Sequence, residues 1–152
     1  MAIRNVVQVG DEVLRQKCFP VEAFDEKLVA LLDDLKDTVK HEQGAGLAAP
    51  QVGVLRRVVV VDVEEGYFEF INPRITSQKG EQFGWEGCLS VRGKQGAVSR
   101  PMKVKLVYQD RNGKEQTLSA KGFFARAICH ELDHLDGVLY IDKAQHVERV
   151  RD

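Results

Sequence analysis

The sequence predicts an α+β fold in which antiparallel β-sheets are wrapped around one central helix. The β-branched run at 55–63 and the alternating run at 102–109 are typical of strands. The Asp-Arg-Asn-Gly turn at 110–113 closes the second run into an antiparallel hairpin. Residues 122–136 have the apolar spacing of a helix. Strands joined by short turns around one enclosed helix are typical of this fold class.

The remaining elements follow from local patterns. Residues 24–39 carry the apolar stripe of an amphipathic helix, with Asp25 at its N-terminal end and Gly44 as its expected stop. We expect further strands at 67–71, ending at Asn72-Pro73, at 74–83 with a break near Gly80, and at 115–119. The central helix ends at Gly137, and residues 138–141 are expected to add a last short strand.

Composition indicates one cytoplasmic domain over residues 1–152. A chain of this length can bury one sizeable core. The 22 basic and 23 acidic residues give a formal net charge of −1, which does not support direct nucleic-acid binding or a membrane-surface role. The N-terminal segment lacks the apolar core of a signal peptide, and no apolar run reaches the length of a membrane span. Three cysteines are too few for a disulfide framework, so we expect them to be reduced.

The clearest chemical signal is the His-Glu-x-x-His motif at 130–134. On a helix, His130 and His134 lie on one face with Cβ atoms roughly 5–6 Å apart, close enough to share a metal ion. Glu131 lies about 100° around the helix, where it can take a proton from a metal-bound water. Apolar neighbours on the same arc indicate that the imidazoles face the interior. We expect three charged residues on the opposite side: Arg126, Asp133 and Asp136.

A catalytic metal needs a third protein ligand besides two histidines. Cys88 is the best candidate, because it lies on a glycine-flanked loop that presents its thiolate without steric hindrance. Cys129 points about 100° away from His130 and is expected to lie outside the site. The other two imidazoles, His41 and His146, lie on the amphipathic helix and in a charged tail.

A small, uncharged stretch at 44–51 is the third unusual segment. Its two glycines, Gly44 and Gly46, allow backbone to approach a ligand closely, and Gln51 offers an amide donor. We therefore expect a binding loop here.

Together, these three blocks resemble the peptide deformylase family. Residues 44–51 are similar to its GxGLAAPQ motif, 86–90 to EGCLS and 130–134 to HExDH, in the same order and over almost the whole chain. The resemblance implies an α+β fold with antiparallel sheets around a central metal-binding HExxH helix. It also implies a hydrolase that removes the formyl group from N-formylmethionine on newly made proteins and releases formate.

The resemblance implies a metal site of Cys88, His130 and His134, with Glu131 as the acid/base. It implies iron(II) as the physiological metal, although one thiolate and two imidazoles are also compatible with zinc, nickel or cobalt. The implied partners are N-formylmethionyl nascent peptides, with transient proximity to the ribosome.

The resemblance also implies that Gln51 and the backbone N–H of Leu89 stabilise the oxyanion. Arg100 is expected to border the substrate cleft, and Glu86 to support the site. The implied substrate-binding residues are Gly44, Ala45, Gly46, Glu86, Gly87 and Arg100. The sequence departs from the family pattern at Arg92 and Cys129, where many members carry proline and glutamine.

Two other functional classes remain compatible with the motif. A metzincin-like protease requires histidine at the position of Tyr140, and a thermolysin-like protease requires a downstream glutamate, for which only Glu148 is available. A metal-binding protein without catalysis is the second alternative, and the presence of Glu131 and Gln51 weighs against it.

Overall fold

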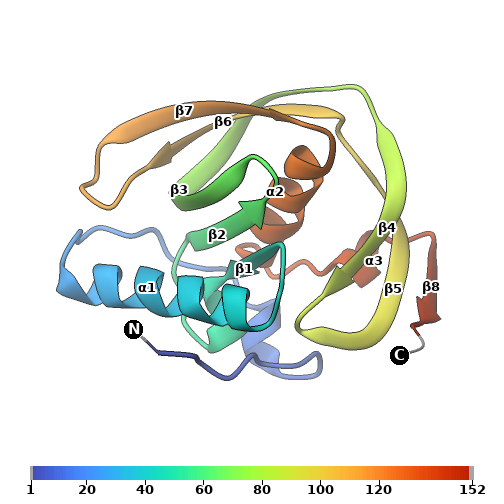
Figure 1. The fold of residues 1–152 in the computed structure, drawn as a ribbon, viewed down its shortest axis with the longest axis horizontal. Coiled ribbons are helices and arrows are strands. Elements are labelled where there is room, and N and C mark those ends of the chain that lie inside the picture. The colour runs from blue at the N-terminus through green and yellow to red at the C-terminus, as the bar shows by residue number, and fades with distance from the viewer. Residues whose placement is uncertain (1, 151–152) are drawn as a thin grey trace.

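The computed structural model describes residues 2–150 and contains two antiparallel sheets around a buried helix (Figure 1). The elements follow the chain as η1 (Glu12–Arg15), α1 (Glu26–His41), β1 (Gly46–Ala48), η2 (Ala49–Val52), β2 (Val58–Val63), β3 (Gly66–Lys79), β4 (Gln82–Cys88), β5 (Val91–Arg100), β6 (Lys103–Gln109), β7 (Glu115–Lys121), α2 (Gly122–His134), α3 (Tyr140–Lys143) and β8 (His146–Arg149).

The strands form a five-stranded sheet, in the order β1-β2-β3-β6-β7, and a three-stranded sheet, in the order β4-β5-β8. All pairings between these strands are antiparallel. Helix α2 contacts strands of both sheets, so the two sheets meet around it. The predicted α+β class with antiparallel sheets is confirmed.

Ten of the thirteen residues of helix α2 are buried, and its apolar residues place one side of the helix in the core. Ile128 and Ala125 share one core cluster with Val59 and Val61 of β2. The alternate residues Val58 and Val60 belong to a second cluster, in which they pack with the apolar stripe of α1. Strand β2 is therefore buried on both faces, which explains its unbroken run of valines. Among the described residues, no helix is long and apolar enough to cross a membrane.

Two predicted boundaries are wrong, because strand structure is present at 46–48, where a loop was expected, and at Asn72-Pro73, where a strand was expected to end. Residues 46–48 form the edge strand β1, paired with Val59–Val61 across an antiparallel register. Strand β3 continues through Asn72-Pro73, where the register shifts between Ile71 and Arg74. Asn72 adopts φ +51° and its side chain bonds the N–H and carbonyl of Val21 at 2.8 and 2.9 Å. The Asn-Pro pair therefore bends the strand without ending it.

The C-terminal part also differs from expectation. Instead of a strand at 138–141, the chain forms the short helix α3, and the Asp142 carboxylate accepts a hydrogen bond from the N–H of Leu139 at 3.0 Å.

Strand β5 has no strand-like sequence pattern, since it contains Gly93 and Gly96, and it forms by pairing with β4 on one side and β8 on the other. Helix α1 ends at His41, before the expected Gly44 stop, with Gln43 at φ +55°.

Candidate metal centre and active site

Cys88, His130 and His134 converge on one point. Each offers one ligand atom, and these atoms all lie within 4.8 Å of one another. The Cys88 Sγ lies 3.5 Å from His134 Nε2. Cys88 ends strand β4 whereas both histidines lie on α2, so the packing of the three-stranded sheet against this helix creates the cluster.

The surroundings of both imidazoles suit metal ligation. His130 Nδ1 lies 2.8 Å from Glu86 Oε1, and histidines that bind metals commonly donate their other ring N–H to a carboxylate in this way. Burial lowers the pKa of His134 well below its ordinary value, which favours the neutral imidazole that a metal ligand requires. One thiolate and two imidazoles, with a carboxylate behind one of them, fit a catalytic divalent transition metal.

Glu86 is the centre of a buried ion-pair network. Arg100 binds both of its carboxylate oxygens, at 2.8 and 2.9 Å, and Arg126 Nη1 binds Oε2 at 2.7 Å. Arg100 also binds Asp133 at 2.7 Å. Burial opposes ionisation of Glu86, but hydrogen bonds from Arg100 and His130 hold its pKa down at about 2. The network therefore keeps Glu86 charged and orients His130.

This network corrects two sequence-based expectations. Arg100 does not border the cleft, because its side chain is only 2% exposed and its guanidinium is occupied by Glu86 and Asp133. Arg126 and Asp133 were expected on the solvated side of the helix, but both face this network. Positions 126, 130 and 133 follow i, i+4 and i+7 spacing, so they share one helix face, and this spacing is the signal that should have identified Arg126.

Glu131 lies directly beside the histidines. Its Oε2 is 4.0 Å from His130 Nε2, and its Oε1 has no hydrogen-bond partner among residues 2–150. A Cβ at Gly46 would lie only 2.6 Å from Oε2, so a glycine is required for β1 to pack against this carboxylate. Burial raises the pKa of Glu131 to about 7. A carboxylate in this state exchanges protons readily near neutral pH.

Gln51 is held beside Cys88. Its Oε1 accepts a hydrogen bond from the N–H of Ala48 at 2.9 Å, and its Nε2 donates to Ser90 Oγ at 3.0 Å. The same Nε2 lies 3.6 Å from Cys88 Sγ. Sequence analysis missed Ser90, which is fully buried and fixes the direction of this amide.

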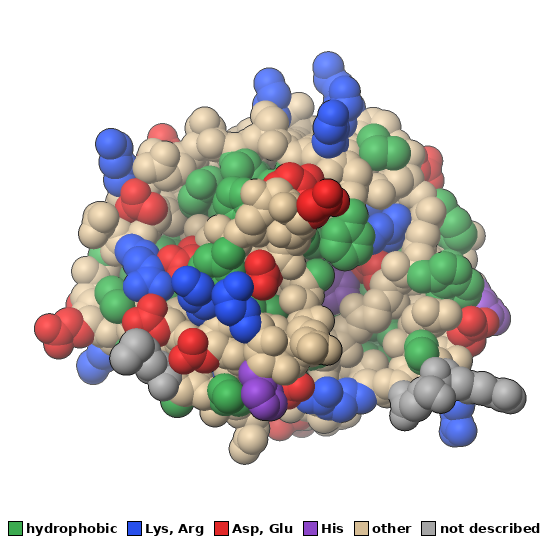
Figure 2. Space-filling model, in the orientation of Figure 1, with side chains coloured by type: hydrophobic (Ala, Val, Ile, Leu, Met, Phe, Trp, Pro, Cys, Tyr) green, Lys and Arg blue, Asp and Glu red, His purple; other side chains and the backbone are tan. Residues whose placement is uncertain are grey.

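A cavity of about 320 Å³ opens onto Cys88, His130 and Glu131. Its lining includes the glycine-rich segment and the apolar side chains of Trp85, Leu89 and Phe123. Trp85 and Phe123 are 49% and 59% exposed and lie at its rim. Among the residues predicted to bind substrate, the cavity contacts Gly44, Ala45, Gly46, Glu86 and Gly87. Figure 2 shows a hollow on this face, with a histidine side chain visible inside it.

The other candidate ligands lie elsewhere. Cys129 is buried in the core, and burial raises the pKa of its thiol to about 11. Tyr140, at the metzincin position, is buried with its ring centroid 5.8 Å from that of His130. Glu148 is exposed on β8 and bonds Gln95 at 3.0 Å. None of these three residues belongs to the metal-ligand group found within the described part of the chain.

A family model described as polypeptide deformylase matches residues 3–150. The chain belongs to this family. The peptide deformylase of Thermoanaerobacter pseudethanolicus is 54% identical over 144 residues, which cover 95% of this chain and 91% of that protein. Peptide deformylase 1 of Clostridium acetobutylicum is 49% identical over 148 residues, covering 97% of this chain and 99% of that protein.

Solved peptide deformylases share the fold. The Thermotoga maritima enzyme superposes with a TM-score of 0.93 at 37% identity, covering 96% of this chain and 100% of that one. The Synechococcus elongatus enzyme in complex with actinonin gives a TM-score of 0.91 at 39% identity, covering 94% and 79%.

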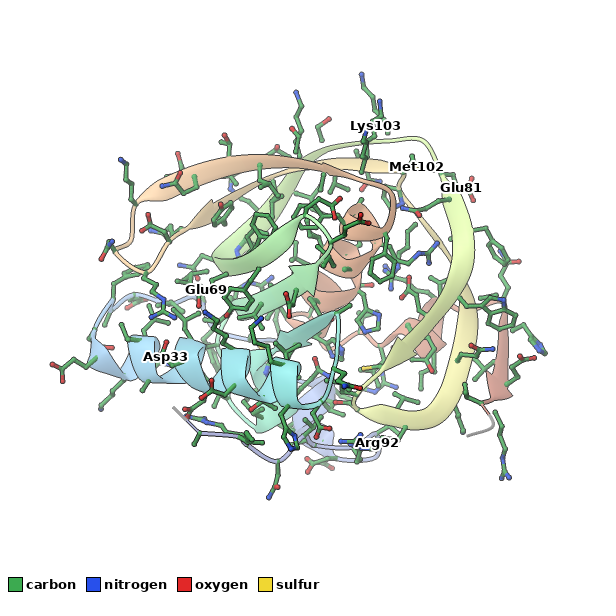
Figure 3. The ribbon with its side chains drawn as sticks, in the orientation of Figure 1. Asp33, Glu69, Glu81, Arg92, Met102 and Lys103 are labelled. Atoms are coloured by element: carbon green, nitrogen blue, oxygen red, sulfur yellow. The ribbon has the colours of Figure 1, made fainter. Side chains whose placement is uncertain are left out.

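The buried network predicts a large difference between two arginine substitutions. Arg100→Leu leaves the buried Glu86 and the partly buried Asp133 with fewer cations, so we expect it to lower the free energy of unfolding by about 3 kcal/mol. Arg92→Ala removes only an exposed pair with Glu42, 3.3 Å long, and should cost less than about 1 kcal/mol (Figure 3). Urea unfolding of both variants provides the comparison, and equal losses would contradict this role of the network.

Proposed function

We propose that this deformylase-family protein is a metal-dependent hydrolase that removes the formyl group from N-formylmethionine at the N-terminus of newly made proteins. The observation that carries the proposal is the convergence of Cys88, His130 and His134 with Glu131 beside them, where all but His134 line one cavity. We also propose one catalytic domain over residues 1–152, acting in the cytoplasm near the ribosome. The family match over residues 3–150 supports the single domain.

Cys88, His130 and His134 are the proposed metal ligands. A divalent metal held by them supplies a Lewis acid that activates water near neutral pH. We propose iron(II) as the physiological ion, because the family resemblance implies it and the donor set is compatible with it. Protein loaded anaerobically with iron(II) should then release formate faster than the zinc form and lose activity in air, whereas an air-stable zinc form of equal kcat/KM contradicts this choice.

Glu131 is the proposed proton carrier. Its carboxylate accepts a proton from the water that attacks the formyl carbon and then delivers it to the departing amine, leaving formate and a free N-terminus. A pKa near 7 suits transfer in both directions. The contact with Gly46 and the burial of the side chain hold the carboxylate at this position.

The developing negative charge on the formyl oxygen needs fixed donors. We propose the Gln51 side-chain amide and the backbone N–H of Leu89 for this role. The support for Gln51 is its defined orientation, with Oε1 held by the N–H of Ala48 and Nε2 directed toward Cys88 and Ser90. A preorganised donor of this kind stabilises the transition state without a cost of reorientation.

The substrate backbone is proposed to pair with the free edge of β1. This strand is at the end of the five-stranded sheet, and its partner β2 lies on one side only. Gly44, Ala45 and Gly46 line the cavity beside that edge, so an extended peptide can add to it as a further strand. The apolar part of the cavity, including Leu89 and Phe123, is proposed to receive the methionine side chain.

Formate release distinguishes this function from the alternatives. With a short formyl-Met peptide, we expect formate and an intact peptide chain. Cleavage of an internal bond without formate indicates an HExxH protease, and metal binding without either product indicates a binding protein. The positions of Tyr140 and Glu148 already disfavour the two protease classes.

Two cysteine variants test the ligand set. Cys88→Ala removes a proposed ligand, so we expect loss of both bound metal and activity, because two imidazoles alone hold the ion weakly. Cys129→Ala shortens a buried side chain outside the cluster and should keep most of both. Metal analysis of the purified proteins provides the measurement, and equal metal loss in the two variants overturns the assignment.

Two further variants separate metal binding from catalysis. Glu131→Gln should retain the metal but lose most turnover, since the amide does not accept the proton from water. Gln51→Leu should also lower kcat, with little metal loss and little change in KM, since its donor acts chiefly in the transition state. Steady-state kinetics with metal analysis checks both variants, and near-normal kcat in Glu131→Gln contradicts the acid/base role.

A further inference from the structure

Three lysines lie side by side on the five-stranded sheet. Lys79 of β3 is directly opposite Lys103 of β6, and Lys103 is directly opposite Lys121 of β7. Residues directly opposite on antiparallel strands project from the same face, and neighbouring strands lie about 4.8 Å apart. All three side chains are exposed, and Figure 3 shows Lys103 beside Met102 at the start of β6.

A second row extends this charge along β6. Lys105 lies between Ser77 of β3 and Ser119 of β7. Together with the three lysines, these side chains border a shallow recess of about 420 Å³. The intervening residue Val104 is buried in the core, so the lysines point outward. We call Lys79, Lys103, Lys105, Lys121, Ser77 and Ser119 the lysine face.

The lysine face is not neutralised from within the protein. Among the described residues, the lysines that form ion pairs are Lys40 and Lys143, neither of which belongs to it. Glu64 and Glu65 border an adjoining hollow with Lys103 and Lys121 but make no ion pair with them. Like charges directly opposite on neighbouring strands destabilise a sheet. The fold therefore carries an electrostatic cost that an anionic partner would relieve.

We propose that the lysine face binds the phosphate backbone of RNA. Four cations and two hydroxyls, spaced by the regular pairing of three strands, suit a chain of phosphates. The net charge of −1 conceals this local concentration of positive charge.

The lysine face lies close to the active-site cavity. Lys121 is two residues before Phe123, which lies at the rim of the active-site cavity. RNA bound to the sheet therefore lies beside the cavity without covering the residues assigned to catalysis. In Figure 2, basic side chains project from the edge of the molecule above this sheet. The proposal does not depend on the reaction proposed for the cavity.

Fluorescence anisotropy with a labelled 20-nucleotide uridine RNA tests the proposal. We expect the logarithm of the binding constant to fall with the logarithm of salt concentration with a slope of about −3, since each phosphate contact on a single strand contributes about −0.7. The double variant Lys103→Glu, Lys121→Glu should bind at least about tenfold more weakly. The charge-matched control Lys17→Glu, Lys27→Glu changes exposed lysines elsewhere and should bind like the parent.

Folding of the variants is measured independently of RNA. Lys103→Glu places an acid between two lysines, so the midpoint of thermal unfolding should rise by about 1–3 °C while RNA binding weakens. The neutral pair Lys103→Gln, Lys121→Gln should show an intermediate affinity. Formate release from a short formylated peptide should be unchanged in all of these variants. If the parent and every variant release no formate, this result contradicts the proposed reaction and leaves the RNA proposal unaffected.

Three outcomes overturn the proposal. The first is no RNA binding by the parent at 50 mM salt, and the second is an equal loss of affinity in the control variant. The third is binding of polyglutamate or phosphatidylserine vesicles as tight as binding of RNA, with the same dependence on Lys103 and Lys121, which shows a general anion surface instead of an RNA site.

Discussion

The contact of Glu86 with Arg100, Arg126 and His130 is the interaction on which the site depends. It joins strands β4 and β5 to helix α2 through groups that are all buried. A buried carboxylate is costly unless cations and hydrogen bonds compensate it, so the network is stable only when complete. Its completion orients the His130 ring and fixes the end of β4 near α2. Cys88 reaches the two histidines as a consequence.

Two buried carboxylates at this site have opposite properties because their neighbours differ. Glu86 is surrounded by guanidinium groups and an imidazole, which hold its pKa at about 2. For Glu131, on the same helix, burial outweighs the attraction of His130 and Arg100 and raises the pKa to about 7. One carboxylate is thereby kept as a permanent anion for positioning, while the other is suited to gain and lose a proton.

Small residues allow the site to close around these groups. Gly46 leaves the space that the Glu131 carboxylate occupies, and a Cβ at Gly44 would lie 2.9 Å from the Leu89 side chain. The glycine-rich segment is therefore required first for packing of protein on protein. Its outer edge has no strand partner among the described residues, because β1 is the terminal strand of the five-stranded sheet. The glycine-rich segment therefore packs against Glu131, the proposed acid/base, and also provides the proposed contact with the substrate.

The sequence alone determined the elements whose signals are local. The apolar stripe of α1, the valine run of β2 and the hairpin of β6 and β7 follow from periodicity and turn chemistry, and HExxH spacing places two imidazoles on one helix face. Only the tertiary structure decided that residues 91–100 and 146–149 are strands, because their hydrogen bonds depend on partners distant in sequence. Burial of Arg100 and Arg126 was likewise decided by tertiary packing. A charged side chain is stable in the interior only beside its counter-ion. Glu86 meets Arg100 where β4 pairs with β5, and it meets Arg126 only after this hairpin packs on α2.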